Sequence, residues 1–257
     1  MLPPGLLVEG APEAIRAAFG ALCALQPVRM TPVGLVCAPR CAPEEAAAAL
    51  ARCPLPTRAL AEVPGWPDPP AAMVAGWYRR SPDHAPAPPG VRELVQAAGE
   101  GFGPGGHATT AMCLEALEVM PTGPALDAGC GSGLLAQAWA ALGRGPVLAY
   151  DLDPRALDQA ARSLEAAGLA GRVTLRRGAL GALAPAEIAG RVLIANVPLE
   201  AHRSLLARIG APPAAAVLSG IRPEAADALV DAYRAHGLRV RATDRDGRFA
   251  CVAMVAA

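Results

Sequence analysis

Residues 125–133, with the sequence ALDAGCGSG, decide the fold, because a short apolar strand is followed directly by a glycine-rich turn. A helix is expected to begin just after the turn, near Leu134. A turn of this kind lets a ligand approach the backbone closely. The dinucleotide fingerprint G-x-G-x-x-G would need a glycine at position 134, so the pattern is instead G-x-G-x-G preceded by an acid. The three glycines assigned to the ligand site are Gly129, Gly131 and Gly133.

Two acids flank this turn in the predicted fold. Asp127 lies two residues before the first glycine, where a carboxylate would repel a pyrophosphate but suits an amino group. Asp151 ends the next predicted strand, in LAYDLDP, where it could accept hydrogen bonds from both hydroxyls of a ribose. S-adenosylmethionine carries both an α-amino acid and an adenosine ribose, so it is the predicted cofactor. The alternative is a glycine turn with two surface carboxylates.

Strand and helix patterns alternate regularly after residue 99. This is typical of an α/β fold with a parallel sheet wrapped by helices. The last two strands are separated only by residues 243–248, which contain Asp246-Gly247 and predict an antiparallel hairpin at the sheet edge. The predicted strands are 125–128, 147–150, 173–176, 192–195, 215–219, 238–242 and 249–255, and the clearest helices are 134–142, 154–167 and 223–236.

The front of the chain is organised differently. Residues 1–63 predict a small α+β domain, with a possible role in substrate recognition; its strands are expected at 6–8 and 33–37 and its helices at 12–25 and 43–52. Residues 64–99 are rich in proline and predict a linker, interrupted by a short helix at 71–80. The catalytic domain is expected to span residues 100–257.

Composition narrows the classes of function. Arginine and lysine (23) balance aspartate and glutamate (23), so no nucleic-acid partner is expected. The hydrophobic fraction of 53% excludes disorder as the main state. Seven cysteines, without a C-x-x-C pair, indicate neither a disulfide framework nor a metal site. Neither a signal peptide nor a membrane span is recognised, so we expect a cytoplasmic protein that does not bind membranes.

Asn196 is the predicted catalytic residue. It follows an apolar strand in RVLIAN, at the sheet edge where such folds bind ligands. Its side-chain oxygen could accept a hydrogen bond from an attacking amine; the alternative is that Asn196 caps the following helix. The segment Asn196-Val197-Pro198-Leu199 half resembles the Asn-Pro-Pro-aromatic motif of enzymes that methylate planar amides and adenine. Leu199 cannot stack on a planar target, which favours a flexible aliphatic amine.

Five segments resemble those of one known family. GFGPGGHATT at 101–110 is similar to its A-F-G-T-G-x-H-x-T-T loop, and LDAGCGSGLLA (126–136), YDLDP (150–154), LIANVPLEAHRSLL (193–206) and LSGIRPE (218–224) also agree. The chain from residue 101 on thus resembles the PrmA-type methyltransferases, which trimethylate amino groups of a ribosomal protein. The resemblance implies a class I methyltransferase fold, in which a seven-stranded sheet ends in an antiparallel hairpin.

The resemblance also implies further site residues. Thr110, Gly129, Asp151 and Asn196 occupy positions at which family members contact S-adenosylmethionine, and we also assign Phe102 of the 101–110 loop to the cofactor site. The same loop could close over the cofactor as a lid. His107 could accept a proton from the substrate amine or could order the loop through a hydrogen bond. The residues assigned to the lid are Gly103, Gly105 and His107.

Three hypotheses of function follow. The leading one is an S-adenosylmethionine-dependent N-methyltransferase that acts on amino groups of a protein, with a ribosomal protein as the expected substrate. The second keeps the cofactor and the fold but makes the acceptor a small molecule. The third is a cofactor-binding assembly or regulatory factor without catalysis. The sequence leaves the acceptor and the oligomeric state open.

Overall fold

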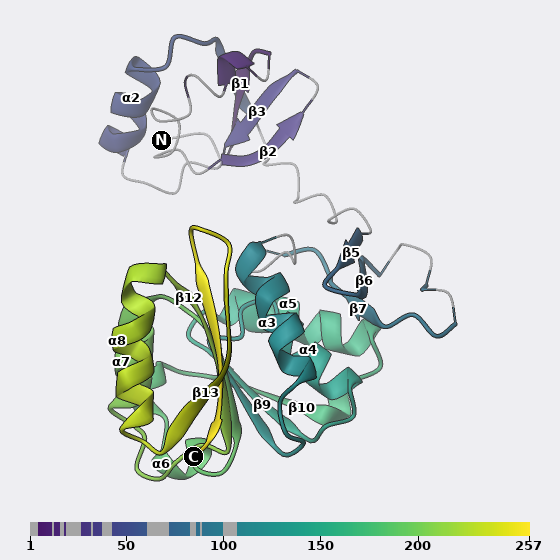
Figure 1. Cartoon of the computed structure of the whole chain (residues 1–257). Helices are drawn as coiled ribbons and strands as arrows, with labels where there is room; N and C mark the ends of the chain where they lie inside the picture. The colour runs from purple at the N-terminus through teal and green to yellow at the C-terminus, as the bar shows by residue number, and fades with distance from the viewer. Residues whose placement is uncertain are drawn as a thin grey trace. The chain divides into compact units, whose positions relative to one another are not determined.

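The computed structural model describes residues 5–11, 13–15, 18, 27–31, 33–37, 43–60, 72–82, 86–87, 89–99 and 107–257. The chain divides into two compact units, Met1–Pro67 and Asp68–Ala257. Of the sheets in the described residues, one lies in the first unit and two lie in the second (Figure 1). Each unit has its own buried apolar core. None of the helices in the described part of the chain has the length and apolar character that a membrane crossing needs.

The first unit contains an antiparallel sheet and a helix. The sheet has the strand order β2-β3-β1-β4, and its strands are β1 (Gly5–Glu9), β2 (Pro27–Thr31), β3 (Gly34–Cys37) and β4 (Thr57–Leu60). Helix α2 (Pro43–Ala51) shares a buried core with β1 and β3. The two predicted strands and the helix predicted at 43–52 are present. Most of the helix predicted at 12–25 lies outside the described residues. The described residues of this range, 13–15 and 18, are helical.

The prediction of a short helix at 71–80 was wrong. This segment forms a hairpin of β5 (Ala72–Val74) and β6 (Trp77–Arg80), and β6 pairs in parallel with β7 (Glu93–Val95). The turn residues Ala75 and Gly76 have φ values of 48° and 78°. Positive φ at both central residues is the signature of the turn that matches strand twist, but Ala-Gly is a weaker signal for it than Asn-Gly. The prediction therefore missed the hairpin.

The second unit is built on a seven-stranded sheet with the order β10-β9-β8-β11-β12-β14-β13. The first five strands in this order are parallel, and β14 is antiparallel to both of its neighbours. The predicted parallel sheet with a C-terminal hairpin is thereby confirmed. The strands are β8 (Ala125–Ala128), β9 (Val147–Asp151), β10 (Val173–Arg177), β11 (Val192–Asn196), β12 (Ala215–Ile221), β13 (Leu238–Arg245) and β14 (Ala250–Ala256).

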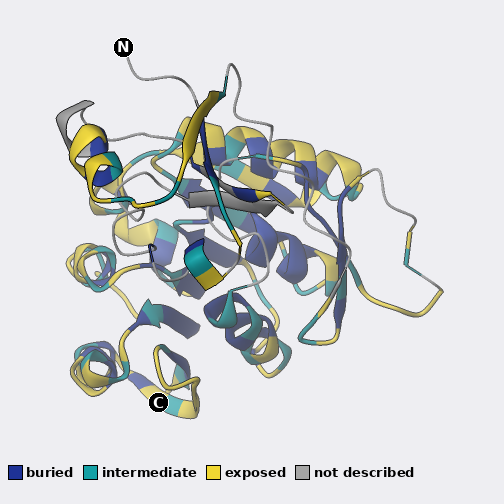
Figure 2. Ribbon diagram, turned by 90° about the horizontal axis from the view of Figure 1, so that it is seen from above, coloured by how far each residue is buried: buried dark blue, intermediate teal, exposed yellow. Residues whose placement is uncertain are grey.

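Helices cover both faces of this sheet (Figure 1). One buried core lies between the sheet and α3, α4 and α5, and a second lies between the sheet and α6, α7 and α8. Figure 2 shows the buried strands in dark blue between helices whose outer sides are yellow. Burial on both faces explains why these strands are continuous apolar runs. The helices are α3 (Ala108–Glu118), α4 (Leu134–Ala141), α5 (Pro154–Ala166), α6 (Pro185–Ile188), α7 (Leu199–Leu206) and α8 (Pro223–Arg234).

The end of β7 and the segment after it are bonded to helices of the second unit. The buried amide of Gln137 on α4 accepts from the Val95 N–H at 2.7 Å and donates to the Val95 carbonyl at 2.8 Å. On α5, the Gln159 amide donates to the Ala97 carbonyl and the Ser163 hydroxyl accepts from the Ala97 N–H. This part of the predicted linker is therefore an integral part of the second unit.

The strand order reverses direction between β8 and β11. In open parallel sheets, ligands bind outside the carboxyl ends of the strands at such a point. Asp127 on β8 pairs with Ile194 on β11, and Asn196 follows two residues later. Because side chains alternate along a strand, Asp127 and Asn196 emerge on the same face, the face that also carries α3 and α4.

Candidate cofactor and active site

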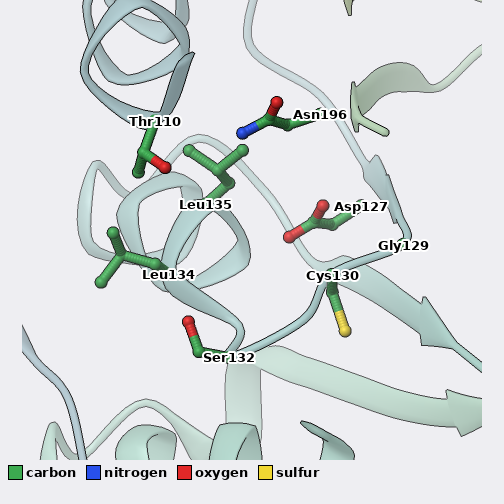
Figure 3. A pocket seen from close by; sticks show the side chains of 8 residues that line it. All are labelled: Thr110, Asp127, Gly129, Cys130, Ser132, Leu134, Leu135 and Asn196. Atoms are coloured by element: carbon green, nitrogen blue, oxygen red, sulfur yellow. The ribbon is translucent and has the colours of Figure 1, made fainter. Parts of the chain in front are cut away.

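Two adjoining cavities lie at the reversal point, and both are lined by Gly129 and Asn196. The smaller has a volume of about 20 Å³ and is shown in Figure 3. The larger has a volume of about 500 Å³. The remaining residues of the smaller cavity are Thr110, Asp127, Cys130, Ser132, Leu134 and Leu135. Those of the larger are His107, Thr109, Gly131, Asp151, Val197, Pro198, Gly220 and Phe249.

The glycine loop needs glycine for its backbone and for its packing. Gly129, Gly131 and Gly133 have φ values of 77°, 53° and 79°, which side chains rarely allow. A Cβ on Gly129 would lie only 2.4 Å from Cγ1 of Val197, and one on Gly133 would lie 2.8 Å from Cβ of Ala160. The loop thus runs close beside the segment that follows β11 and close beside α5.

Asp127 is a buried acid that faces the smaller cavity. It is 1% exposed, and Oδ2 accepts a hydrogen bond from the Ala136 N–H at 2.9 Å. Burial, with a smaller contribution from the negative charge of Asp151, raises the pKa of Asp127 to about 7. A cationic group placed beside it would favour its ionised form. An amino group is therefore a suitable partner for this carboxylate.

Asp151 ends β9 and lines the larger cavity. Its Oδ2 accepts from the Gly131 N–H at 2.8 Å and its Oδ1 accepts from the Asp153 N–H at 2.9 Å. These bonds fix the carboxylate at the cavity wall. Because a carboxylate oxygen can accept more than one hydrogen bond, Asp151 can still receive two hydroxyl groups of a ribose.

Asn196 lies where the two cavities meet. Its Nδ2 donates to Oγ1 of Thr109 at 3.1 Å. Its Oδ1 is buried and has no hydrogen-bond partner among the residues that the structure describes. The helix-capping alternative was wrong, because α7 begins after Pro198, which occupies the cap position, and the Asn196 side chain bonds to α3 instead.

The described end of the 101–110 segment, residues 107–110, lies at the site, where α3 begins. His107 caps this helix, and its Nδ1 accepts from the Thr109 N–H and lies 2.7 Å from Oγ1 of Thr109. Thr110 is 2% exposed and lines the smaller cavity, as Figure 3 shows. The other residues assigned to this loop, Phe102, Gly103 and Gly105, lie outside the described residues.

Sequence reasoning missed several residues of the larger cavity, among them Thr109 and Phe249. Thr109 lies on α3, which is distant from Asn196 in the sequence, and it contacts the Asn196 side chain. Phe249, next to β14, presents its ring edge-to-face with the His107 ring, with the ring centroids 5.0 Å apart. Leu199 packs against the second buried core and lines neither cavity in the described part of the chain. The aromatic wall therefore comes from the C-terminal hairpin; the hairpin was predicted, but no local pattern indicates that Phe249 reaches the cavity.

The sheet order, the glycine loop and the two acids together define the fold of the class I methyltransferases. A family model described as "Ribosomal protein L11 methyltransferase (PrmA)" matches residues 92–257. The chain therefore belongs to the ribosomal protein L11 methyltransferase (PrmA) family. The match begins just before β7, in agreement with the bonding of that segment to α4 and α5.

Individual relatives support the assignment. A Pelotomaculum thermopropionicum protein named ribosomal protein L11 methyltransferase is 41% identical over 160 residues, which are 60% of this chain and 51% of that protein. A protein of the same name from Deinococcus radiodurans is 37% identical over 186 residues, which are 68% of this chain and 66% of that one. The chain thus matches between about half and two thirds of the length of these relatives.

A solved structure agrees with the fold. The ribosomal protein L11 methylase of Lactobacillus delbrueckii subsp. bulgaricus superposes with a TM-score of 0.60 at 22% identity, covering 70% of this chain and 95% of that one. The expected class I fold is therefore observed both in the strand order and by comparison.

Proposed function

We propose that the chain is an S-adenosylmethionine-dependent methyltransferase that methylates amino groups of a protein. The observation that carries this proposal is the buried Oδ1 of Asn196 at the junction of the two cavities, which has no hydrogen-bond partner among the described residues. An unpaired buried acceptor is costly to keep, so it indicates a donor that arrives with a ligand. An amine N–H is such a donor.

The residues present fit the cofactor at both of its ends. Asp127 and Thr110, in the smaller cavity, would hold the α-amino acid part, and Asp151, in the larger cavity, would hold the ribose hydroxyls. Gly129 and Gly131 would let the cofactor lie against the backbone. When bound, S-adenosylmethionine supplies a methyl group on a positively charged sulfur that becomes a neutral thioether after transfer.

The chain's own residues then have to orient an amine and exclude water. Asn196 Oδ1 accepts a hydrogen bond from the amine and thereby fixes the direction of the nitrogen lone pair. Val197, Pro198 and Phe249 supply apolar walls to the larger cavity. The only carboxylate among the described residues that line this cavity is that of Asp151, which we assign to the ribose. Only a neutral amine has the lone pair that forms the new N–C bond as the S–C bond breaks. With no second carboxylate among the described lining residues, the proton of the methylated nitrogen passes to solvent.

A ribosomal protein is the proposed acceptor, because the relatives are named ribosomal protein L11 methyltransferase. The test uses labelled S-adenosylmethionine and purified ribosomal subunits from cells of the source organism that lack this protein. Label in a ribosomal protein is the expected result. Label in a small-molecule fraction of a lysate would move the acceptor to a metabolite, and no turnover at all would leave only a cofactor-binding factor.

Asn196 can be tested in the same assay. Asn196→Ala removes the acceptor oxygen, and we expect kcat to fall about 100-fold with a smaller change in cofactor affinity. Ser204→Ala, on the exposed side of α7, is the control and should keep full activity. An Asn196→Ala variant with unchanged kcat would contradict the assigned role.

A further inference from the structure

A hydrogen-bonded chain at the start of α3 determines which way the Asn196 amide faces. The Thr109 hydroxyl lies at its centre, 3.1 Å from Nδ2 of Asn196 and 2.7 Å from Nδ1 of His107. An amide nitrogen can only donate, so the Thr109 oxygen is the acceptor in the first bond. The hydroxyl proton of Thr109 is then directed to Nδ1 of His107.

The His107 ring is suited to receive that proton. Its Nδ1 also accepts from the Thr109 backbone N–H at 3.3 Å, as the cap of α3. A nitrogen that accepts from both groups carries no proton, so the ring proton of neutral His107 is on Nε2. The edge-to-face contact with Phe249 holds the ring from another side.

This arrangement matters because the two ends of an amide have nearly the same shape but opposite hydrogen-bonding character. If the amide turned over, Nδ2 would take the place of Oδ1 and could not accept a hydrogen bond from an amine. In Figure 3 the amide nitrogen of Asn196 points toward the helix that carries Thr110, and the oxygen points away from it. Thr109 is 1% exposed, so water does not compete for this bond.

We propose that Thr109, supported by His107, is a positioning residue that holds the Asn196 amide with its oxygen free for the acceptor amine. This inference rests on the proposed function, because it assigns the origin of the orientation that methyl transfer needs. Thr109 acts through Asn196 and is not itself required to touch the amine.

The kinetic test compares two substitutions of Thr109 in the full chain. Thr109→Val keeps the shape but removes the hydroxyl, and we expect kcat to fall about 10- to 100-fold while the cofactor Kd changes less than about threefold. Thr109→Ser restores the hydroxyl and should recover most of the lost rate. Thr174→Val, an exposed position on β10, is the matched control and should behave as the unchanged protein.

A second measurement does not depend on activity. Long-range ¹H–¹⁵N correlation spectra of the four histidines report which ring nitrogen carries the proton. His107, identified by the loss of its signals in His107→Gln, should show a protonated Nε2 and an unprotonated Nδ1. The Thr109→Val variant should show a mixture of both tautomers.

The outcomes separate this inference from the proposed function. An active protein whose Thr109→Val variant keeps its kcat would overturn the inference alone. A folded protein in which Nδ1 of His107 carries the proton would overturn it as well, even if the Thr109→Val variant failed to fold. A protein that transfers no methyl group would overturn the proposed function and, with it, this inference.

Discussion

We expect Asp127 to couple the protonation of the site to the binding of the proposed cofactor. Its carboxyl is buried, and its pKa of about 7 means that the unliganded protein holds a proton there through the mildly acidic range. A bound ammonium group would favour the ionised form, so binding would release that proton below pH 7. Affinity for S-adenosylmethionine should therefore depend on pH in a direction set by this one residue.

We expect the association constant to rise roughly fivefold from pH 6 to pH 7, as the ionised fraction of Asp127 increases. Isothermal titration calorimetry in buffers of different ionisation enthalpy would also show the released proton. Asp127→Asn should bind more weakly at pH 7 and lose this dependence, whereas Asp158→Asn, an exposed acid on α5, should keep it. A pH-independent affinity of the unchanged protein would contradict the assignment.

The same shift affects the fold. The folded pKa of Asp127 is raised above that of the unfolded chain, so the folded state binds a proton that the unfolded state has already lost. Stability from this residue is present at low pH and decreases as pH rises from about 4 to about 7. Asp127→Asn, which should weaken cofactor binding, should thus also make the unliganded protein more stable at pH 8.

Residues within one sequence pattern could be recognised without a structure, and residues brought in from elsewhere could not. The turn at 129–133 and the acids before and after it form a local pattern with a physical meaning. Thr109 and Phe249 reach the cavity only because α3 and the C-terminal hairpin meet at the end of β11. Such contacts depend on the packing of distant elements.

At the scale of elements, Gln137 joins the short sheet of β5, β6 and β7 to the main body of the second unit. It is fully buried, it bonds both backbone groups of Val95, and its Nε2 also donates to the Ser163 carbonyl at 3.4 Å. A buried peptide group without a partner costs about 1–3 kcal/mol. The amide therefore has a larger effect on stability than its position on an apolar helix would indicate.

We expect Gln137→Ala to lower the free energy of unfolding by about 2–4 kcal/mol, because it leaves both the N–H and the carbonyl of Val95 unpaired. Alanine is a good helix former, so the effect would not come from α4 itself. Urea unfolding of the full chain measures the change, with Glu165→Ala on the exposed side of α5 as the control. A change below about 1 kcal/mol would contradict this account.

The helices and strands that were predicted correctly are those with the clearest sequence patterns. β8 has the predicted bounds 125–128, and the C-terminal hairpin was predicted from Asp246-Gly247. A short helix was predicted for AAMVAGWYRR at 71–80, between the prolines, although the segment forms a hairpin that pairs with β7. Gln137 and Gln159, which bond the end of β7 and the segment after it, look in the sequence like ordinary polar positions of helices α4 and α5. Nothing in the sequence therefore indicated that part of the predicted linker is packed against these helices.

At the scale of the whole molecule, the two units have separate cores, and every described site residue belongs to the second unit. We expect two transitions in differential scanning calorimetry of the full chain. S-adenosylmethionine at about 100 times its Kd should raise the midpoint of one transition by about 5–10 °C and leave the other unchanged. A single transition, or an equal shift of two, would contradict separate cores.

The position of β14 has a consequence for how the protein is made. This strand is synthesised after β12 and β13, yet it lies between them rather than at an edge. Until it is in place, β12 keeps an open edge and Phe249 cannot complete the cavity wall. A nascent chain that has not been translated past residue 256 should therefore lack a finished cavity, and the proposed activity should require that β14 has been added to the sheet.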